Sequence, residues 1–93
     1  RLEYLRKNMK NLTRSEKAVM DAYELMANHE NHDKKIDIET VGELLNISPK
    51  TVETHKANIY RKLKLHNNAQ FAVAVYVNAI EVDSLLAQVG EKR

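Results

Sequence analysis

The sequence predicts an all-α fold, a bundle of four helices with room for a short fifth helix from Asp83 to before Gly90. Gly and Pro account for only 2 and 1 of the 93 residues, while apolar residues make up 43% and charged residues 30%. This balance is typical of helices with polar outer faces. Apolar residues also recur at helical spacing behind residues that cap helices. Because this length supports one core, we expect one domain over residues 12–93, with 1–11 as a connector or the end of an upstream helix.

The first helix of the bundle is predicted to begin at Thr13. Glu16 follows three residues later and completes a capping box, in which each side chain satisfies a backbone N–H of the first turn. An apolar stripe then continues at helical spacing through Val19, Tyr23 and Met26. The polar run 28–35 ends this stripe, and we expect a loop there.

Two helices follow in close succession. Asp37 is the predicted N-cap of a second, short helix, whose inner stripe is Val41, Leu44 and Leu45. Ser48 is predicted to cap a third helix over 49–63, with Pro49 in the first turn, where its missing N–H costs nothing. The inward row of this third helix is predicted to be Val52, His55 or Lys56, Ile59 and Leu63.

The connection between these two helices predicts a helix-turn-helix. Only residues 46–48 separate them, which suits a turn that crosses the helices steeply. Gly42 lies inside the second helix, where glycine costs about 0.5–1 kcal/mol relative to alanine, so we expect that a Cβ would obstruct the third helix. Asn46 tolerates the left-handed conformation that ends a helix. Val52 would fill the angle between the helices.

The fourth helix is predicted to begin at a cap on Asn67 or Asn68 and to run over 68–80. It is apolar on two sides: Phe71, Val75 and Ala79 on one, and Val73, Val77 and Ile80 on the other. A domain of this size seldom surrounds one helix completely. We therefore expect a homodimer that forms through Val73, Val77 and Ile80.

Positive charge is concentrated on the third helix. Residues 49–66 hold five basic residues and one acidic residue, a net +4, whereas 21–43 carry a net −5. A basic segment in a chain whose net charge is +2 is typical of a surface that meets phosphates. A solvated helix face explains the same charge equally well.

The outward side of the third helix favours the phosphate interpretation. At about 100° per residue, the residues opposite the inward row are Lys50, Thr54, Ala57 and Arg61, flanked by Thr51, Glu53 and Asn58. Ala57 permits close approach to a DNA groove, and Thr54 and Asn58 can bond to base edges. Lys50 and Arg61 can pair with guanine or with phosphate.

Glu53 is the exception on this side because a carboxylate repels phosphates. It either accepts a hydrogen bond from a cytosine amino group or pairs with Lys56, and a surface ion pair is the more common outcome.

Three strings, LTRSEKAVM, TVGELLNISPKTVETHKANIYRKL and HNNAQFAVAV, resemble the LuxR-type helix-turn-helix domains of the NarL, FixJ and GerE group over residues 12–80. The resemblance implies a bacterial transcription regulator (a response regulator) that binds double-stranded promoter DNA as a dimer through the fourth helix, below an upstream receiver or sensor domain. It implies base contacts at Glu53, Thr54 and Ala57. Combined with the residues on the outward side of the third helix, the expected base contacts are Lys50, Glu53, Thr54, Ala57 and Asn58. The expected phosphate contacts are Thr51, Lys56, Arg61 and Lys62.

The chain departs from this family in two respects. The stretch between Met20 and Val41 is longer than in typical members, and loops accept such additions at small cost. Ser15 and Asn68 stand where arginine is frequent, and Arg14 with the basic N-terminal arm can partly replace that charge.

Other functions are less well supported. The rivals are a sigma-factor region-four-like module that docks on RNA polymerase, and a protein-interaction domain that uses 68–80. Without cysteine or a Gly-rich phosphate loop we expect no enzyme and no cofactor. His29 and His32 have a spacing that could hold a metal, but a solvated loop is the better interpretation, and we expect none. His55 is interpreted as a packing residue.

Location and completeness follow from the same sequence. The longest apolar run, 71–77, is far shorter than the roughly 20 residues that span a bilayer, so we expect a soluble, cytoplasmic protein with no membrane contact. The chain begins with Arg1 rather than Met, which suggests a piece of a longer protein.

Overall fold

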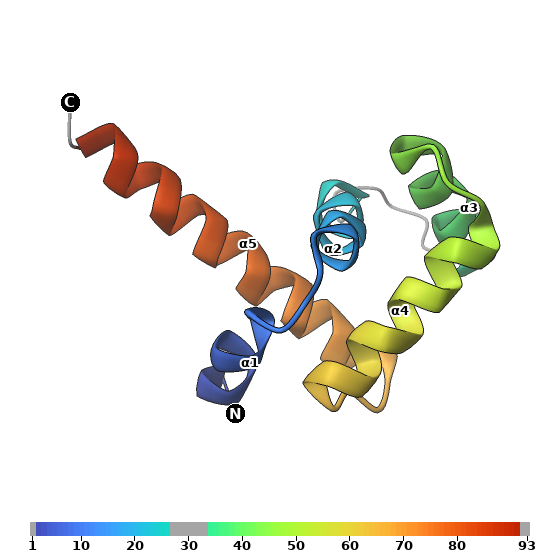
Figure 1. Ribbon diagram of the computed structural model, residues 1–93, viewed down its shortest axis with the longest axis horizontal. Helices are drawn as coiled ribbons and strands as arrows, with labels where there is room; N and C mark the ends of the chain where they lie inside the picture. Colours follow the sequence, from blue (N-terminus) through green and yellow to red (C-terminus); the bar gives the residue numbers. More distant parts are fainter. Residues whose placement is uncertain (1, 27–33, 92–93) are drawn as a thin grey trace.

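A computed structural model describes residues 2–26 and 34–91, with side chains for 2–26 and 37–80. The described residues form five helices and no strand, which confirms the predicted all-helical fold (Figure 1). The helices are α1 (Leu2–Met9), α2 (Arg14–Met26), α3 (Lys34–Leu45), α4 (Pro49–Leu63) and α5 (Asn68–Glu91).

The arrangement resembles a V whose arms are α4 and α5. Both diverge from the turn at 64–67, and α2 lies between them (Figure 1). Helix α3 packs on α2 and α4, and α1 packs on α4 and α5. The largest fully buried side chains come from α2, α3 and α4: Met20, Ile59, Leu63, Val19, Val41 and Val52. This shared core holds α4 at a fixed angle to its neighbours.

Residues 2–9 pack into the same core as the rest of the chain. Leu5 and Met9, one helical turn apart, are 2% and 5% exposed. The Tyr4 ring lies against the end of α4, with its centroid 5.7 Å from Lys64 Nζ. This helix therefore covers the end of α4 and part of α5.

Three of the predicted helix caps are confirmed. Thr13 and Glu16 exchange the two hydrogen bonds of a capping box at 2.9 and 3.1 Å. Ser48 Oγ accepts from the Thr51 N–H at 3.1 Å, with Pro49 as the first residue of α4. Asn67 Oδ1 accepts from the Gln70 N–H at 2.9 Å and caps α5.

The predicted cap at Asp37 is wrong. Helix α3 begins at Lys34, so Asp37 lies in its first turn. A carboxylate is favourable in either place because both lie at the positive end of the helix dipole. The position of Asp37 therefore predicted that a helix starts nearby, but not which residue is its first. The predicted loop at 28–35 lies mostly outside the described residues.

The predicted end of the fourth helix at Ile80 is also wrong. Helix α5 continues without a break from Asn68 to Glu91, so the short fifth helix expected from Asp83 is its continuation. Residues 81–91 contain no proline, and an aspartate inside a helix costs only a fraction of a kcal/mol. No helix in the described part of the chain is long and apolar enough to cross a membrane.

Candidate nucleic-acid interface

The turn between α3 and α4 has the close-packed geometry that its residues predict. Asn46 adopts φ = 57°, and the Ile47 N–H donates to the Gly42 carbonyl oxygen at 2.8 Å, which closes α3 in a Schellman-type end. A Cβ on Gly42 would lie 2.7 Å from the Ile47 carbonyl oxygen and 3.6 Å from Pro49 N. The close approach is therefore confirmed, but the obstacle is the backbone of the turn rather than the body of the next helix.

The inward row of α4 is also as predicted. Val52, Ile59 and Leu63 are fully buried, while His55 and Lys56 are half-buried at its edge. With this row in the core, the opposite side of α4 must face outward.

The outward face of α4, defined here as Lys50, Glu53, Thr54, Ala57 and Arg61, consists of exposed residues. Asn58 and Thr51, at its margins, are half-buried. Its polar groups bond only within the helix: Thr54 Oγ1 donates to the Lys50 carbonyl oxygen at 3.1 Å, and Arg61 donates to Asn58 Oδ1 at 3.2 Å. The face therefore remains accessible along its length.

Comparison with known proteins finds a similarity in this segment. Residues 37–75 match the family described as bacterial regulatory proteins, luxR family. The match confirms the resemblance over most of α3, all of α4 and the start of α5. The luxR family is one of DNA-binding transcription regulators, not of enzymes. The chain has no match among the curated proteins or the solved structures with which it was compared.

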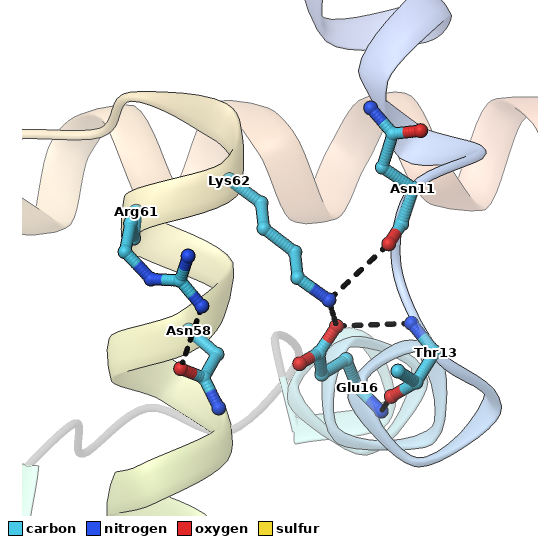
Figure 2. A network of polar contacts seen from close by, with 6 residues as sticks. All are labelled: Asn11, Thr13, Glu16, Asn58, Arg61 and Lys62. Atoms are coloured by element: carbon cyan, nitrogen blue, oxygen red, sulfur yellow. Dashed lines mark hydrogen bonds and ion pairs between the residues drawn. The ribbon is translucent and has the colours of Figure 1, made fainter.

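Lys62, predicted to contact phosphate, is half-buried and points to another part of the fold. Figure 2 shows its side chain crossing from α4 to the connection between α1 and α2, while Arg61 bends along α4 to Asn58. Lys62 Nζ lies 2.7 Å from Glu16 Oε1 and 3.2 Å from the Asn11 carbonyl oxygen. Reaching a phosphate would require Lys62 to leave both partners.

Glu16 is the buried member of this pair, with its whole residue 3% exposed. Burial raises the pKa of its carboxyl group, but hydrogen bonds from Lys62 and from the Thr13 N–H, with the charge of Lys62, more than offset this. The pKa of Glu16 therefore lies below its usual value, so its carboxyl group is charged at neutral pH. The ion pair between Glu16 and Lys62 joins the first turn of α2 to the last turn of α4.

Lys56, a second predicted phosphate contact, is also engaged within the fold. Its Nζ lies 5.0 Å from the Phe71 ring centroid and 5.1 Å from that of Tyr23. Lys56 and Lys62 thus contact other helices, whereas the residues of the outward face are exposed. Lys56 also lines a surface hollow with Glu53 and Ala57 of the outward face.

The predicted dimerisation residues do not share one environment. Val73 and Ile80 are 46% and 36% exposed, but Val77 is 6% exposed and belongs to the core of the single chain. With Tyr76 and Ile80 it lines a pocket with Leu2 and other residues of α1. Val77 is therefore largely enclosed within the single chain, and its role in a dimer stays a prediction. Sequence reasoning missed Tyr76, which at 66% is the most exposed large apolar side chain among residues 68–80.

The candidate metal residues cannot be placed, because His29 and His32 lie outside the described residues. Within the described ranges, no group of three histidine or acidic residues could hold a metal ion. His55 is half-buried beside the inward row of α4, at the position expected for a packing residue.

Proposed function

We propose that this chain binds double-stranded DNA sequence-specifically as the output domain of a bacterial transcription regulator, with the outward face of α4 in the major groove. The main observation that supports this proposal is that the exposed face lies within the segment that matches the luxR family. An α-helix fits the major groove, where the base edges distinguish all four base pairs.

Within this proposal the residues of the outward face and of its margins divide into two roles. Lys50, Glu53, Thr54, Ala57 and Asn58 contact base edges, while Arg61 and Thr51 contact phosphates. Arg61 lies near the end of α4 and Thr51 near its start, so the two anchors would flank the reading residues. Ala57 has no side chain beyond Cβ, which lets the helix backbone approach the bases closely.

The first experiment is selection of bound duplexes from random DNA, followed by affinity measurement at increasing salt. We expect a consensus sequence to emerge, and binding to weaken steeply with salt because phosphate contacts release counterions. Failure to enrich any sequence, together with salt-insensitive binding to a protein partner, would reject DNA binding in favour of an interaction domain.

Two substitutions separate reading from anchoring. Thr54→Ala should change the base preference at one position of the selected site, with a cost of about 1–3 kcal/mol for the preferred base. Arg61→Gln should weaken binding to all sequences alike and reduce the salt slope by about 0.9. Lys7→Gln, at an exposed lysine of α1, is the control for lost charge and should leave the base preference unchanged. If Thr54→Ala and Arg61→Gln merely scale affinity, the division of roles is wrong.

We further propose that two copies associate through α5 to read paired half-sites, and that a receiver or sensor domain controls them in the full-length protein. The exposed side chains Val73, Tyr76 and Ile80 support the first part, because two of them exceed 40% exposure on one helix. Tyr76→Glu should yield monomers in sedimentation. Leu44→Glu, at a similarly exposed residue of α3, should leave the association state unchanged. A Tyr76→Glu protein that still dimerises would reject this surface.

A further inference from the structure

Three aromatic rings from three different helices meet beside α4. Phe71 of α5, 5% exposed, is at the centre. Its ring stacks on Tyr60 of α4 at 5.5 Å between centroids and 24° between planes, and Tyr23 of α2 meets it edge-on at 5.1 Å and 89°. The Tyr60 hydroxyl donates to Asn68 Oδ1 at 2.9 Å, which fixes that ring to the start of α5.

The Lys56 ammonium group lies against all three rings. Its Nζ is 5.0 Å from the centroid of Phe71, 5.1 Å from that of Tyr23 and 5.9 Å from that of Tyr60. A cation within about 6 Å of a ring centroid is attracted by the negative face of the ring, most strongly where water is partly excluded. Lys56 is half-buried, so its ammonium group is partly withdrawn from water.

The position of Lys56 on α4 gives this contact a geometric effect. At about 100° per residue, Lys56 and Lys62 lie on opposite sides of the buried row Val52, Ile59 and Leu63. Lys62 is held on its side by Glu16 at 2.7 Å. Lys56 is held on the other side by rings that belong to α2 and α5 as well as to α4. Together they restrain rotation of α4 about its own axis, and Ala57 of the outward face directly follows Lys56.

We propose that Lys56 is a positioning residue for DNA recognition, which fixes the rotation of α4 through the ring cluster and contacts no phosphate. This inference rests on the proposed DNA binding. It replaces the phosphate contact that the sequence suggested for Lys56, because an ammonium group that moved to a phosphate would give up contacts with three rings. The ring cluster favours a positive charge at the end of a long, flexible side chain. Methionine has a similar shape to lysine but no charge, so it tests the contribution of the charge.

The decisive measurement is the salt dependence of binding to the selected duplex and to a random-sequence duplex. Lys56→Met should leave the salt slope unchanged on both, whereas Arg61→Met, the same replacement on the outward face, should lower it by about 0.9. Lys56→Met should also reduce the ratio of specific to non-specific affinity about tenfold, comparable to one lost base contact. Lys56→Arg keeps the cation and should restore this ratio.

A second measurement tests the ring contact without DNA. In the unsubstituted domain, ring currents should shift the ε-methylene protons of Lys56 upfield of those of the exposed lysines. Lys56→Met should lower the ratio of folded to unfolded protein by about 5- to 30-fold, and Lys56→Arg by much less.

The outcomes separate the two proposals. A salt slope that falls by about 0.9 in Lys56→Met overturns the inference, because Lys56 then contacts a phosphate. Lys56 protons that resonate with those of exposed lysines overturn it too, as does an unchanged specificity ratio in Lys56→Met. An unsubstituted domain that binds neither duplex rejects the proposed function, and the positioning role with it, even if the shifted protons are present.

Discussion

Helix α4 carries two pairs of cations that differ in what surrounds them. Lys50 and Arg61 are exposed on the outward face, and the hydrogen bond from Arg61 to Asn58 stays within the helix. Lys56 and Lys62 flank the buried row and contact rings or a buried carboxylate from other helices. All four residues contribute equally to the net charge of the segment. Only their angle around the helix distinguishes the exposed cations from those that contact other helices.

The comparison also shows how a helix can be both basic and firmly held. Cations on the flanks bury their apolar stems along the core while their charged ends find partners at its edge. Among the side chains that the structure describes, the cations of the outward face have no such partner in another helix. Charge counts therefore overestimate the phosphate contacts of such a helix unless each cation is assigned to a side of it.

The largest effect is expected from breaking the flanking ion pair. Lys62→Met leaves the Glu16 carboxylate buried without its counterion, so the free energy of unfolding should fall by about 3 kcal/mol. Chemical denaturation measures this. The double variant Lys62→Met with Glu16→Gln should recover part of the loss. If Lys62→Met leaves the stability unchanged and instead lowers the salt slope of DNA binding, Lys62 belongs with the outward cations.

The next largest loss of stability is expected at the turn between α3 and α4, which sets the direction of α4 and of both pairs of cations. Gly42→Ala places a Cβ 2.7 Å from a backbone oxygen that belongs to the same closed turn and cannot move independently. The strain outweighs the better helix propensity of alanine, so we expect a loss of about 2 kcal/mol in unfolding free energy. Glu43→Ala, at the next and exposed residue, is the control and should change stability little. Equal stability in both variants would mean that the turn relaxes freely.

A smaller effect is expected in acid. Because the pKa of Glu16 is lowered in the folded state, its contribution to stability is complete above the unfolded pKa of about 4.3 and is lost as the pH falls through the folded pKa. The stability difference between the wild type and Glu16→Gln should therefore be widest at neutral pH and narrow in acid. Denaturation curves across this range measure it. A difference that widens as the pH falls would contradict the lowered pKa.

Some of the features tested by these variants were predicted from the sequence, and others were not. The capping box, the Ser48 cap, the Asn46 turn and the buried row were predicted because each depends on residues a few positions apart. The Glu16–Lys62 contact joins residues 46 positions apart, and no local pattern indicates it. Lys64 likewise ends α4 at φ = 54°, a conformation more usual for glycine or asparagine.

The outward face was predicted from helical angles alone, whereas the roles of its neighbours were not. Periodicity placed Lys56 at the edge of the core but could not show that rings from α2 and α5 meet there. For the same reason it assigned Val77 to a dimer, since residues 1–11 were expected to be a connector or the end of an upstream helix, and the contact of α1 with α5 follows only from the tertiary fold.

The smallest effect tests whether the rings, rather than their polar groups, hold Lys56. Burial, followed by the nearby charge of Asp37, raises the pKa of Tyr23 to about 12, and among the described residues its buried hydroxyl has no hydrogen-bond partner. Tyr23→Phe keeps the edge-on contact with Phe71 and removes an unsatisfied polar group, so stability should change by less than about 0.5 kcal/mol or rise slightly. Tyr23→Leu, which removes the ring, is the matched comparison and should be clearly destabilising. A loss of more than about 1 kcal/mol in Tyr23→Phe would show that the hydroxyl is bonded, and that the flank of α4 depends on a polar contact as well as on the rings.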